Sequence, residues 1–564
     1  MRRGEHRGTF PAVGRAPLSL PPIPPNRRLP GLLLGAAIVV ATIVGWRQFR
    51  FLTDDAHIAF RYAANSLAGR GLVWNPPPFR PVEGYTSFLW VVLLREIWRT
   101  TGLEPPIVSN YLSLGFGLAT LWVVKGFVGR MGLPAALEPH RRVLLALALS
   151  GIVASRTFLT WLSSGLETAL FNFCLTWWVF EALAPSARHN PTWAMRLSAA
   201  ASATALARPD GLLAAAATPL LLLINRGWWA GPRIVRALAL CPLAAIPAHL
   251  IWRRATYGLW LPNTYFAKHV APWPEAGIRY LGSFIVEHGV WLWLVLLLAW
   301  VALHARASLA NLAASRRFAT LGAVLAVVLG HVAYYVLRIG GDHFEYRVLS
   351  YLVPLIFVTG TWLAAHLAAR PRRAFLLLSA LVLSSLPIPW CHWSLTHNLT
   401  TRKATYLLVR PIADSFPPGL SDIVAVWDDW QAWLIRHTVC NRHQEHKVLY
   451  ESSLALSPRL RATEISWEGH PTMDAAAVGL PGWLLPNVAI IDTYGLNDRV
   501  VAHHPIERLP GVRRMMAHER TPPAGYVSCF RPNVHVVDRT LRIDVRDIPL
   551  TDADIRACES RAWH

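Results

Sequence analysis

Long apolar runs separated by short polar loops dominate the chain from Gly31 to Ile388, and the residues outside that range are much more polar. A helix needs about 20 residues to cross a bilayer, and several runs are shorter, which polar helix ends facing a water-filled cavity would permit. The pattern predicts an α-helical polytopic membrane protein with about eleven transmembrane helices. These are expected at Leu32–Val44, Ile107–Phe127, Val143–Val153, Thr168–Leu183, Leu197–Ala207, Leu212–Ile224, Ala237–Ile251, Gly289–Leu303, Phe318–Leu337, Val348–Ala365 and Phe375–Ile388.

Positive charge falls in every second loop between these runs, which is typical of loops on the cytoplasmic side. Residues 1–30 are basic and too long and proline-rich for a secretory signal, so we expect a cytoplasmic tail before an uncleaved span. The alternation places the loop 47–106 and the tail 393–564 outside, with residues 31–392 as the membrane domain. The basic loops contain Lys125/Arg130/Arg141/Arg142, Arg188/Arg196, Arg226/Arg233/Arg236, Arg306/Arg316/Arg317 and Arg370/Arg372/Arg373.

Two further segments of the first outer loop are expected to be helical without crossing the membrane. Asp55–Leu67 has apolar residues roughly on one face, which predicts an amphipathic helix. Phe88–Leu94 is apolar but far too short for a span, and counting it would break the alternation of basic loops. We therefore interpret it as a helix at the membrane interface.

The tail 393–564 is polar and predicts a small α/β domain. Short strand-like runs, Val488–Ile491 and Val534–Val537, lie between turns rich in Pro and Gly. In an oxidising compartment the tail could form one disulfide, and Cys529 and Cys558 are its nearest pair of cysteines.

The composition supports a membrane protein and argues against a nucleic-acid partner. Hydrophobic residues make up 53% of the chain and charged residues only 16%, although the formal net charge is +22. A basic balance of this size can indicate nucleic-acid binding. Here the arginines lie mainly in short loops between apolar runs, where they act as topology signals.

The strongest candidate chemistry is the pair Asp54-Asp55, directly after the first predicted span. Two adjacent carboxylates cannot both ionise freely, so one pKa should rise towards a value useful for acid–base catalysis. The pair could also bind a divalent metal. A competing interpretation is that Asp54 caps the following helix and Asp55 favours its first turn. Arg61 and Glu83 in the same loop are candidate substrate contacts, although a plain interfacial turn would explain Glu83 almost as well.

Three ionisable residues lie at or near membrane depth, namely Glu167, Arg208 and Asp210. Ionisable groups there are costly and usually have a partner or line a functional cavity. They are candidate substrate-binding groups, and Arg208 is a candidate for binding phosphate. The competing interpretation is a structural arginine–carboxylate pair that orients helices.

Two later outer loops carry further candidates. The loop 253–269 is basic although it is expected outside, and binding a lipid phosphate would explain this. General contact with anionic headgroups is the alternative. Lys268 is its candidate phosphate ligand and Asn263 a candidate substrate contact. The loop 338–347 packs five titratable groups around Gly340-Gly341; its candidates are Asp342, His343, Glu345 and Arg347.

Taken in order, these segments resemble the GT-C glycosyltransferases, and within them the mycobacterial terminal arabinofuranosyltransferases. The resemblance covers roughly residues 45–350 and 485–526. It rests on Asp54-Asp55 with Ile58 and Arg61, Leu67–Gly71, Ser164–Glu167, Arg208–Asp210, Tyr257-Gly258 to Lys268, Gly340–Arg347, Ile491–Asp498, and His518-Glu519 with Pro522 and Pro523.

The resemblance implies a GT-C fold, a polyprenyl-phosphate sugar donor, a cell-envelope glycan or glycolipid acceptor, and chemistry on the periplasmic face of a bacterial plasma membrane. It implies catalysis by Asp54 and Asp55 and donor-phosphate binding by Lys268 and Arg347. Asp210 stands where the arabinosyl relatives tend to have Glu, and Gly84-Tyr85 replaces more polar residues. These departures leave the sugar open, with a pentofuranose such as arabinofuranose as one candidate.

Two other function classes stay open at this point. A transporter or flippase of a lipid-linked sugar would also need membrane spans, but transporters tend to have inverted repeats and polar groups at the midplane. The polar clusters here lie at the outer ends of the predicted spans. A non-catalytic envelope assembly protein with an interacting tail is the third class.

Overall fold

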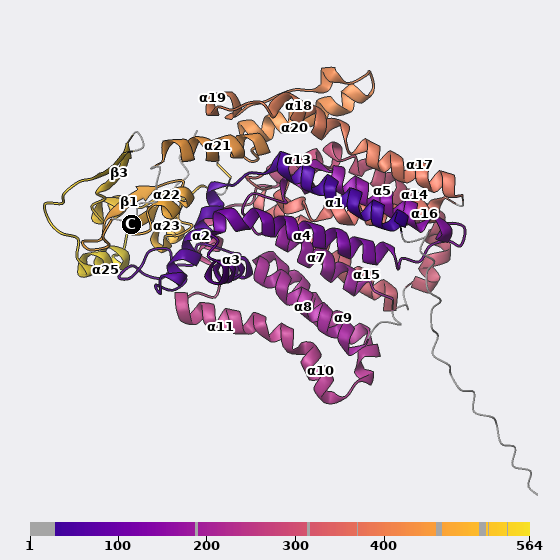
Figure 1. Cartoon of the computed structure of the whole chain (residues 1–564), viewed down its shortest axis with the longest axis horizontal. Helices are drawn as coiled ribbons and strands as arrows, with labels where there is room; N and C mark the ends of the chain where they lie inside the picture. Colours follow the sequence, from indigo (N-terminus) through magenta and orange to yellow (C-terminus); the bar gives the residue numbers. More distant parts are fainter. Residues whose placement is uncertain are drawn as a thin grey trace, which may run out of the picture.

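The protein is a long helical bundle with a small α/β region at one end (Figure 1). The computed structural model describes residues 29–185, 190–312, 316–368, 370–457, 465–506, 515–516, 518–537 and 540–563. Most of the predicted N-terminal tail, and Arg188 in one predicted basic loop, lie outside these residues. The first helix starts at the end of the bundle opposite the α/β region (Figure 1).

Every predicted transmembrane segment is helical in the structure. Within the described residues, six helical segments are long and apolar enough to cross a membrane, or seven if α13 and α14, which meet at an 85° bend, form one span. The count of eleven therefore stays a prediction. The six are α1 (Leu29–Phe49), α4 (Pro105–Val128), α10–α11 (Arg233–Leu240, Ala245–Tyr257), α15 with its π-helical end (Arg316–Ala333, Tyr334–Ile339), the segment Arg347–Leu367 with α16 (Leu352–Leu367), and α17–α18 (Pro371–Ser384, Pro387–Thr396).

Most of the remaining predicted spans are shorter helices, several of them inside the bundle. Nearly every residue of α7 is buried, and α7 packs between α4 and α8. A helix shielded by other helices does not have to match the bilayer thickness, because its ends face protein rather than lipid. The shorter helices are α5 (Arg141–Ala154), α7 (Thr168–Ala182), α8 (Pro191–Ala207) and α9 (Leu212–Ile224). The fifth remaining span, predicted at Gly289–Leu303, lies in the longer α14 (Val290–Leu312), which follows α13 (Pro274–Glu287), a helix that was not predicted as a span.

The first outer loop forms two helices that pack on each other, α2 (Asp54–Leu67) and α3 (Phe88–Thr101). Thr53 is the N-cap of α2, and its Oγ1 accepts a hydrogen bond from the Ala56 amide. The Thr53 amide donates to the Ser164 carbonyl and the Ser164 amide donates to the Phe51 carbonyl, which fixes the start of α2 against the bundle. The helix that begins at Phe88 is twice as long as the apolar run, but at 14 residues it is still too short to span a bilayer.

The chain after α18 first returns along the bundle and then forms the α/β region. Helix α20 (Leu420–Arg436) packs on α13, and α21 (His443–Leu456) leads towards α2. One hydrophobic core runs continuously through both the bundle and the α/β region, across the predicted domain boundary at 392/393. The short helices of this part are α19 (Arg402–Thr405), α22 (Gly479–Leu484), α23 (Arg499–His503), α24 (Tyr526–Cys529) and α25 (Asp552–Ser560).

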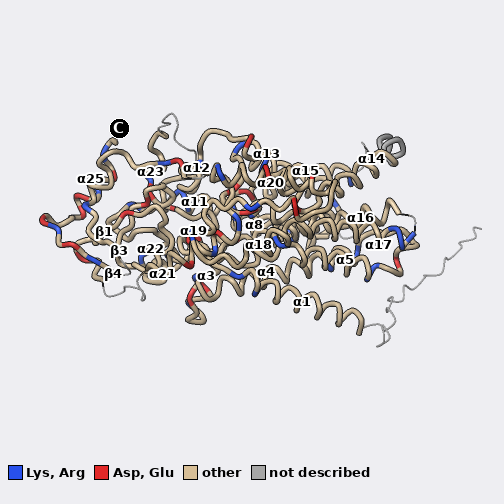
Figure 2. Tube along the Cα trace, turned by 90° about the horizontal axis from the view of Figure 1, so that it is seen from above, with Lys and Arg blue, Asp and Glu red and all other residues tan. Residues whose placement is uncertain are grey.

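The α/β region contains two small sheets. Strand β1 (Thr472–Ala475) lies parallel to β2 (Ala489–Asp492), with Thr472 opposite Ala489. Strand β3 (Val534–Val537) is antiparallel to β4 (Thr540–Ile543). Cys529 and Cys558 form a disulfide, so the predicted strands and the predicted cysteine pair are both confirmed. Charged residues gather around this region and at the far end of the bundle, and the helices carry few charged residues between the two (Figure 2).

Candidate active site

The structure gives the two adjacent aspartates different surroundings. Asp54 accepts two hydrogen bonds from the start of α22, at 3.0 Å from the Gly479 amide and 2.7 Å from the Leu480 amide. Burial raises its pKa to about 6, although both amides favour the charged form. The predicted capping of α2 by Asp54 is wrong, because Thr53 is the N-cap, whereas the predicted place of Asp55 in the first turn of α2 is confirmed. Asp54 instead anchors α22.

Asp55 keeps its carboxylate uncommitted. Among the described residues it accepts no side-chain hydrogen bond and forms no ion pair. It interacts electrostatically with Lys268, His446 and His518, which come from three distant parts of the chain. One half-buried carboxylate is therefore surrounded by one cation and two imidazoles, and it is available to a ligand.

Lys268, the last residue of α12 (Asn263–Lys268), supplies the positive charge that interacts with Asp55. Within the described part of the chain its ammonium group makes no hydrogen bond or ion pair. Burial lowers its pKa, and Asp55 and Asp342 act in the opposite direction. A desolvated ammonium group without a partner is expensive, which favours a site that binds an anion.

The turn before α16 supplies the second cation of the cluster. Arg347 holds the Asp342 carboxylate with two hydrogen bonds of 2.9 and 3.0 Å, and its guanidinium lies 4.4 Å from the centre of the Phe344 ring. Gly340 and Gly341 have φ angles of +98° and +114°, and a side chain on Gly340 would collide with the Trp273 backbone. Glycine is needed here for the turn that brings Asp342 and Arg347 to Lys268.

Arg208 lies near the same cluster but is already neutralised. Its guanidinium is 2.9 Å from Glu167, 3.0 Å from Asp210 and 2.8 Å from the Tyr335 hydroxyl. The hydroxyl of Tyr335 in turn donates to Asp210 at 2.8 Å. This network joins the ends of α7, α8 and α15. It agrees with the competing interpretation from the sequence, in which an arginine–carboxylate pair orients helices. Phosphate binding by Arg208 stays a prediction.

Three other candidates are engaged in contacts between distant parts of the chain. The Arg61 guanidinium donates to the backbone oxygens of Trp74, Gly482, Leu485 and Val488 and to Asn75 Oδ1. Asn263 Nδ2 donates to the carbonyls of Gly495, Leu496 and Asp498. Glu83 is paired with Arg253 at 2.6 Å, and burial raises the Glu83 pKa to about 7. All three are occupied by protein groups, so their contact with substrate stays a prediction.

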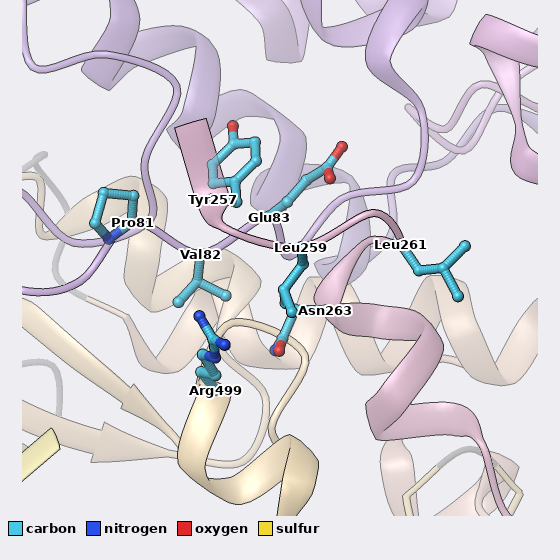
Figure 3. A pocket seen from close by; sticks show the side chains of 8 residues that line it. All are labelled: Pro81, Val82, Glu83, Tyr257, Leu259, Leu261, Asn263 and Arg499. Carbon is cyan, nitrogen blue, oxygen red and sulfur yellow. The ribbon is translucent and has the colours of Figure 1, made fainter. Parts of the chain in front are cut away.

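Figure 3 shows a small hollow at this junction, with Glu83, Tyr257, Asn263 and Arg499 around it. A second hollow lies between α18, α19 and α21, and neither of the two includes Asp55 or Lys268. The candidate site is therefore defined by its side chains, not by these hollows.

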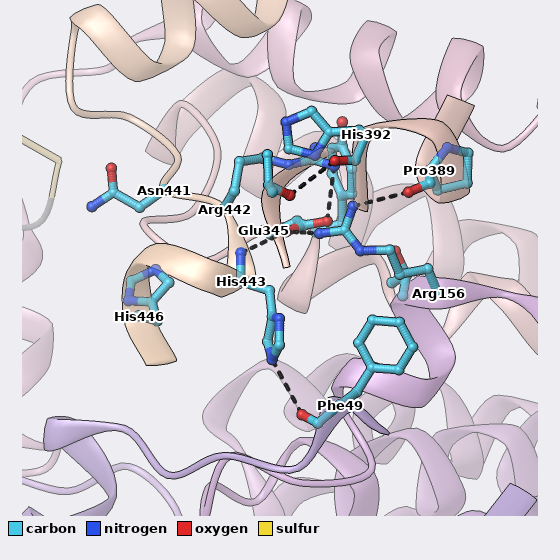
Figure 4. Close-up of polar contacts among 12 residues, drawn as sticks. Phe49, Arg156, Glu345, Pro389, His392, Asn441, Arg442, His443 and His446 are labelled. Atoms are coloured by element: carbon cyan, nitrogen blue, oxygen red, sulfur yellow. Dashed lines mark hydrogen bonds and ion pairs between the residues drawn. The ribbon is translucent and has the colours of Figure 1, made fainter. Parts of the chain in front are cut away.

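Glu345 belongs to a buried ionic network behind the candidate site (Figure 4). Its carboxylate is 2.8 Å from Arg156 and 3.1 Å from Arg442, and it accepts from the His443 amide at 2.7 Å. Arg442 also pairs with Glu287 at 2.9 Å. The network fixes the back of the turn that carries Asp342 and Arg347, and it leaves Glu345 no free oxygen directed at Asp55.

His343 joins two histidines that sequence reasoning did not single out as site residues. Its ring centre is 5.3 Å from that of His446 and 5.2 Å from that of His518. Burial lowers the pKa of all three, for His446 to about 4, so the rings are neutral at neutral pH. His518 lies in a tail motif that carried part of the family resemblance, whereas nothing in the pattern around His446 marked it.

The Asp55 cluster consists of Asp55, Lys268, Asp342, His343, Arg347, His446 and His518. Among the described residues no group of three or more His, Cys, Asp or Glu side chains is placed to hold a metal ion. What the cluster offers a ligand is a free carboxylate beside a free ammonium group, with a second cation and neutral imidazoles close by.

Comparisons with known proteins give two related sequences. The chain is 31% identical over 344 residues to a terminal β-(1→2)-arabinofuranosyltransferase of Mycobacterium tuberculosis, covering 56% of this chain and 53% of the relative. It is 28% identical over 368 residues to the corresponding protein of Corynebacterium glutamicum, covering 59% of this chain and 51% of the relative. The chain thus spans about half the length of the curated relatives it matches. No family model matches the chain.

Among solved structures, the chain is similar to the crystal structure of ArnT from Cupriavidus metallidurans bound to undecaprenyl phosphate. That match has 13% identity and a TM-score of 0.46, and it covers 81% of this chain and 85% of the other. The predicted resemblance is confirmed in sequence: this membrane protein is similar to the terminal arabinofuranosyltransferases over rather more than half of its length.

Proposed function

We propose that this chain is a GT-C-type membrane glycosyltransferase that transfers a sugar from a polyprenyl-phosphate donor to a cell-envelope glycan or glycolipid. A pentofuranose such as arabinofuranose is the first sugar to test, because the two related sequences are named arabinofuranosyltransferases. The observation that carries the proposal is the uncommitted carboxylate of Asp55 beside the uncommitted ammonium group of Lys268.

The reaction needs a group that takes a proton and a group that receives negative charge. In the proposed step, the acceptor hydroxyl oxygen attacks C1 of the sugar while Asp55 takes the hydroxyl proton as general base. The bond between C1 and the phosphate oxygen breaks, and its electron pair leaves with the lipid phosphate. Lys268 and Arg347 neutralise that phosphate. If the configuration is retained, Asp55 acts instead as the nucleophile and forms a glycosyl ester before the acceptor attacks.

The proposed site would face the outside of a bacterial plasma membrane, with the N-terminus cytoplasmic and the tail periplasmic. The alternation of basic loops supports this orientation. A disulfide in the tail agrees with an oxidising compartment. A donor with a polyprenyl chain stays in the membrane, so the cations must lie near helix ends at the bilayer surface. Arg347 is the first residue of the candidate span Arg347–Leu367, and Lys268 lies in the loop between the candidate span Arg233–Tyr257 and α13.

Sugar transfer by the purified protein tests the proposal. Polyprenyl-phosphate arabinofuranose with a labelled sugar is supplied together with an arabinan acceptor, and wild type is compared with Asp55→Asn. We expect Asp55→Asn to be folded and at least about 100-fold slower, because loss of a general base typically costs that much. The exposed Asp422→Asn on α20 is the matched control and should keep full activity.

Two outcomes would contradict the proposal. Full activity of Asp55→Asn would remove the catalytic assignment. Movement of the intact donor across a vesicle membrane without any transfer would indicate a flippase. The anomeric configuration of the product, read by NMR, distinguishes the general-base route from the nucleophile route.

A further inference from the structure

Three arginines from distant parts of the chain meet where the tail touches the end of α11. Arg499 of α23 interacts electrostatically with Arg80 of the first outer loop and with Arg254 of α11. Its Nη1 lies 3.7 Å from the position that a Cβ would take on Gly258. The three form the Arg80–Arg254–Arg499 patch. None of them belongs to the Asp55 cluster.

Two of the three arginines, Arg254 and Arg499, form no ion pair with any carboxylate among the described residues. Among those residues the Arg499 and Arg80 side chains make no hydrogen bond or ion pair, and Arg254 donates only to the Gly258 carbonyl. Of the neighbouring carboxylates, Glu83 holds Arg253. Glu559 accepts from the Arg80 backbone amide and also interacts electrostatically with the Arg80 guanidinium, so it offsets part of the charge of Arg80. Partial burial and the two neighbouring guanidinium groups lower the pKa of Arg499. Because the three guanidinium groups repel one another, an anion bound among them would stabilise this arrangement.

The position of the patch indicates where that anion comes from. The candidate span Arg233–Tyr257 ends beside it, and Arg254 lies in the last turn of that span. Ile251, Trp260 and Leu261 are exposed around it, with 63%, 57% and 38% of their surface accessible. Apolar side chains with a tryptophan at the end of a span are typical of the bilayer interface. Figure 1 shows this end of α11 next to the α/β region, and Figure 3 shows Arg499 beside Val82 and below Tyr257.

We propose that the Arg80–Arg254–Arg499 patch binds the phosphate of an anionic phospholipid headgroup and so docks the α/β region on the membrane surface. A soluble anion would gain nothing from the exposed apolar rim, whereas a phospholipid places its acyl chains against Ile251 and Leu261 and its phosphate among the arginines. This gives Arg254 of the basic outer loop 253–269 a role separate from those of Arg253, which pairs with Glu83, and Lys268, which lies in the Asp55 cluster. The inference does not depend on the catalytic assignment, because no residue of the patch belongs to the Asp55 cluster.

Lipid retention by the full chain in detergent tests the inference. Phosphatidylglycerol is titrated into delipidated protein and counted by native mass spectrometry, with phosphatidylcholine as the neutral lipid. We expect the Arg254→Gln/Arg499→Gln variant to bind phosphatidylglycerol about 30-fold more weakly than wild type, since each surface arginine contributes roughly a factor of five. The matched control is Arg542→Gln/Arg556→Gln, which removes two exposed arginines of the α/β region.

Three results would overturn the inference: equal phosphatidylglycerol binding by wild type and variant, equal retention of phosphatidylcholine, or displacement of the lipid by millimolar inorganic phosphate. If the double variant does not purify as a monodisperse protein, the exposed Arg80→Gln replaces it. That variant should bind about fivefold more weakly, and unchanged binding would contradict the proposal equally.

Discussion

At the scale of single residues, two neighbours with the same side chain have different roles because the fold surrounds them differently. Asp54 is held by two amides of α22, whereas Asp55 interacts electrostatically with Lys268, His446 and His518. A carboxylate that accepts two backbone hydrogen bonds is a poor base for an acceptor hydroxyl, because the proton must displace those bonds. The catalytic role proposed for the pair therefore belongs to Asp55, and Asp54 positions it.

Replacing Lys268 separates donor binding from chemistry. Lys268→Gln removes a charge that has no protein partner within the described residues, so the loss should fall on the bound phosphate. We expect KM for the polyprenyl-phosphate donor to rise at least about tenfold, which is the usual cost of one charge-assisted hydrogen bond. Steady-state kinetics with Lys403→Gln as control measures this, since Lys403 is exposed on α19. An unchanged donor KM would remove Lys268 from the phosphate site.

His446 should make the stability of the protein depend on pH. Burial lowers its folded-state pKa from 6.5 to about 4, against the smaller opposing effects of the His343 carbonyl, Asp55 and Asp342. The unfolded chain takes up a proton between these pH values and the folded chain does not. The neutral ring therefore stabilises the fold fully above pH 6.5, and this contribution is lost as the pH falls towards 4.

The measurement compares melting temperatures of wild type and His446→Gln from pH 7 to pH 4.5. Wild type should lose about 2 kcal/mol more stability than the variant over this range, because one pKa unit corresponds to about 1.4 kcal/mol. Parallel curves for the two proteins would show that the ring is protonated in the folded state.

At the scale of elements, the contact between α2 and α22 decides the geometry of the site. Helix α22 lies on α2 with Gly479 against the Asp54 backbone and Gly482 against Trp74 and Arg61. Arg61 then links α2 to the carbonyls at the end of α22. Two glycines let the helices approach closely enough for Asp54 to reach the amides.

A single methyl group at Gly479 should disturb this contact. An alanine Cβ there would lie 1.9 Å from the Asp54 carbonyl oxygen, which backbone cannot accommodate without moving. We expect Gly479→Ala to cost about 1–3 kcal/mol and to lower the rate of transfer, because α22 is pushed away from α2. Thermal unfolding and the transfer assay measure both effects.

Gly115→Ala in α4 is the matched control for this substitution. Nothing lies within 4 Å of its added Cβ, so it should be neutral or slightly stabilising. A Gly479→Ala protein as stable and active as wild type would show that the α2–α22 contact is not required.

At the scale of the whole molecule, one continuous core joins the bundle to the α/β region. The start of α1 and the α/β region lie at opposite ends of the bundle (Figure 1). If the basic loops are cytoplasmic, as we propose, the tail, the Asp55 cluster and the Arg80–Arg254–Arg499 patch would lie on the outer side.

Reporter fusions to the C-terminus test that orientation. An alkaline phosphatase fusion should be active and a green fluorescent protein fusion exported by the Sec route should be dark, because each reporter folds on only one side of the membrane. Fusions in the loop at Arg370–Arg373 should give the opposite result. A fluorescent C-terminal fusion would invert the topology and place the site in the cytoplasm.

The local pattern of the chain determined the helices. Apolar runs fold as helices in a membrane because each helix satisfies its own backbone hydrogen bonds, so each run identified its helix without knowledge of its neighbours. The acidic pair and the Gly340-Gly341 turn were likewise recognisable from short stretches. Periodicity and residue type are sufficient for features of this kind, since they depend on a few adjacent residues.

Only the tertiary structure decided which candidates are free to act. From the sequence, several polar residues were candidates for substrate contact just as Asp55 was. In the structure each of them is bonded to protein groups, some of them hundreds of residues away; these residues are Arg61, Glu83, Asn263 and Glu345. His446 joined the Asp55 cluster from a segment that carried no signal. The availability of a polar group depends on what the folded chain brings within hydrogen-bonding distance, and local sequence does not encode that proximity.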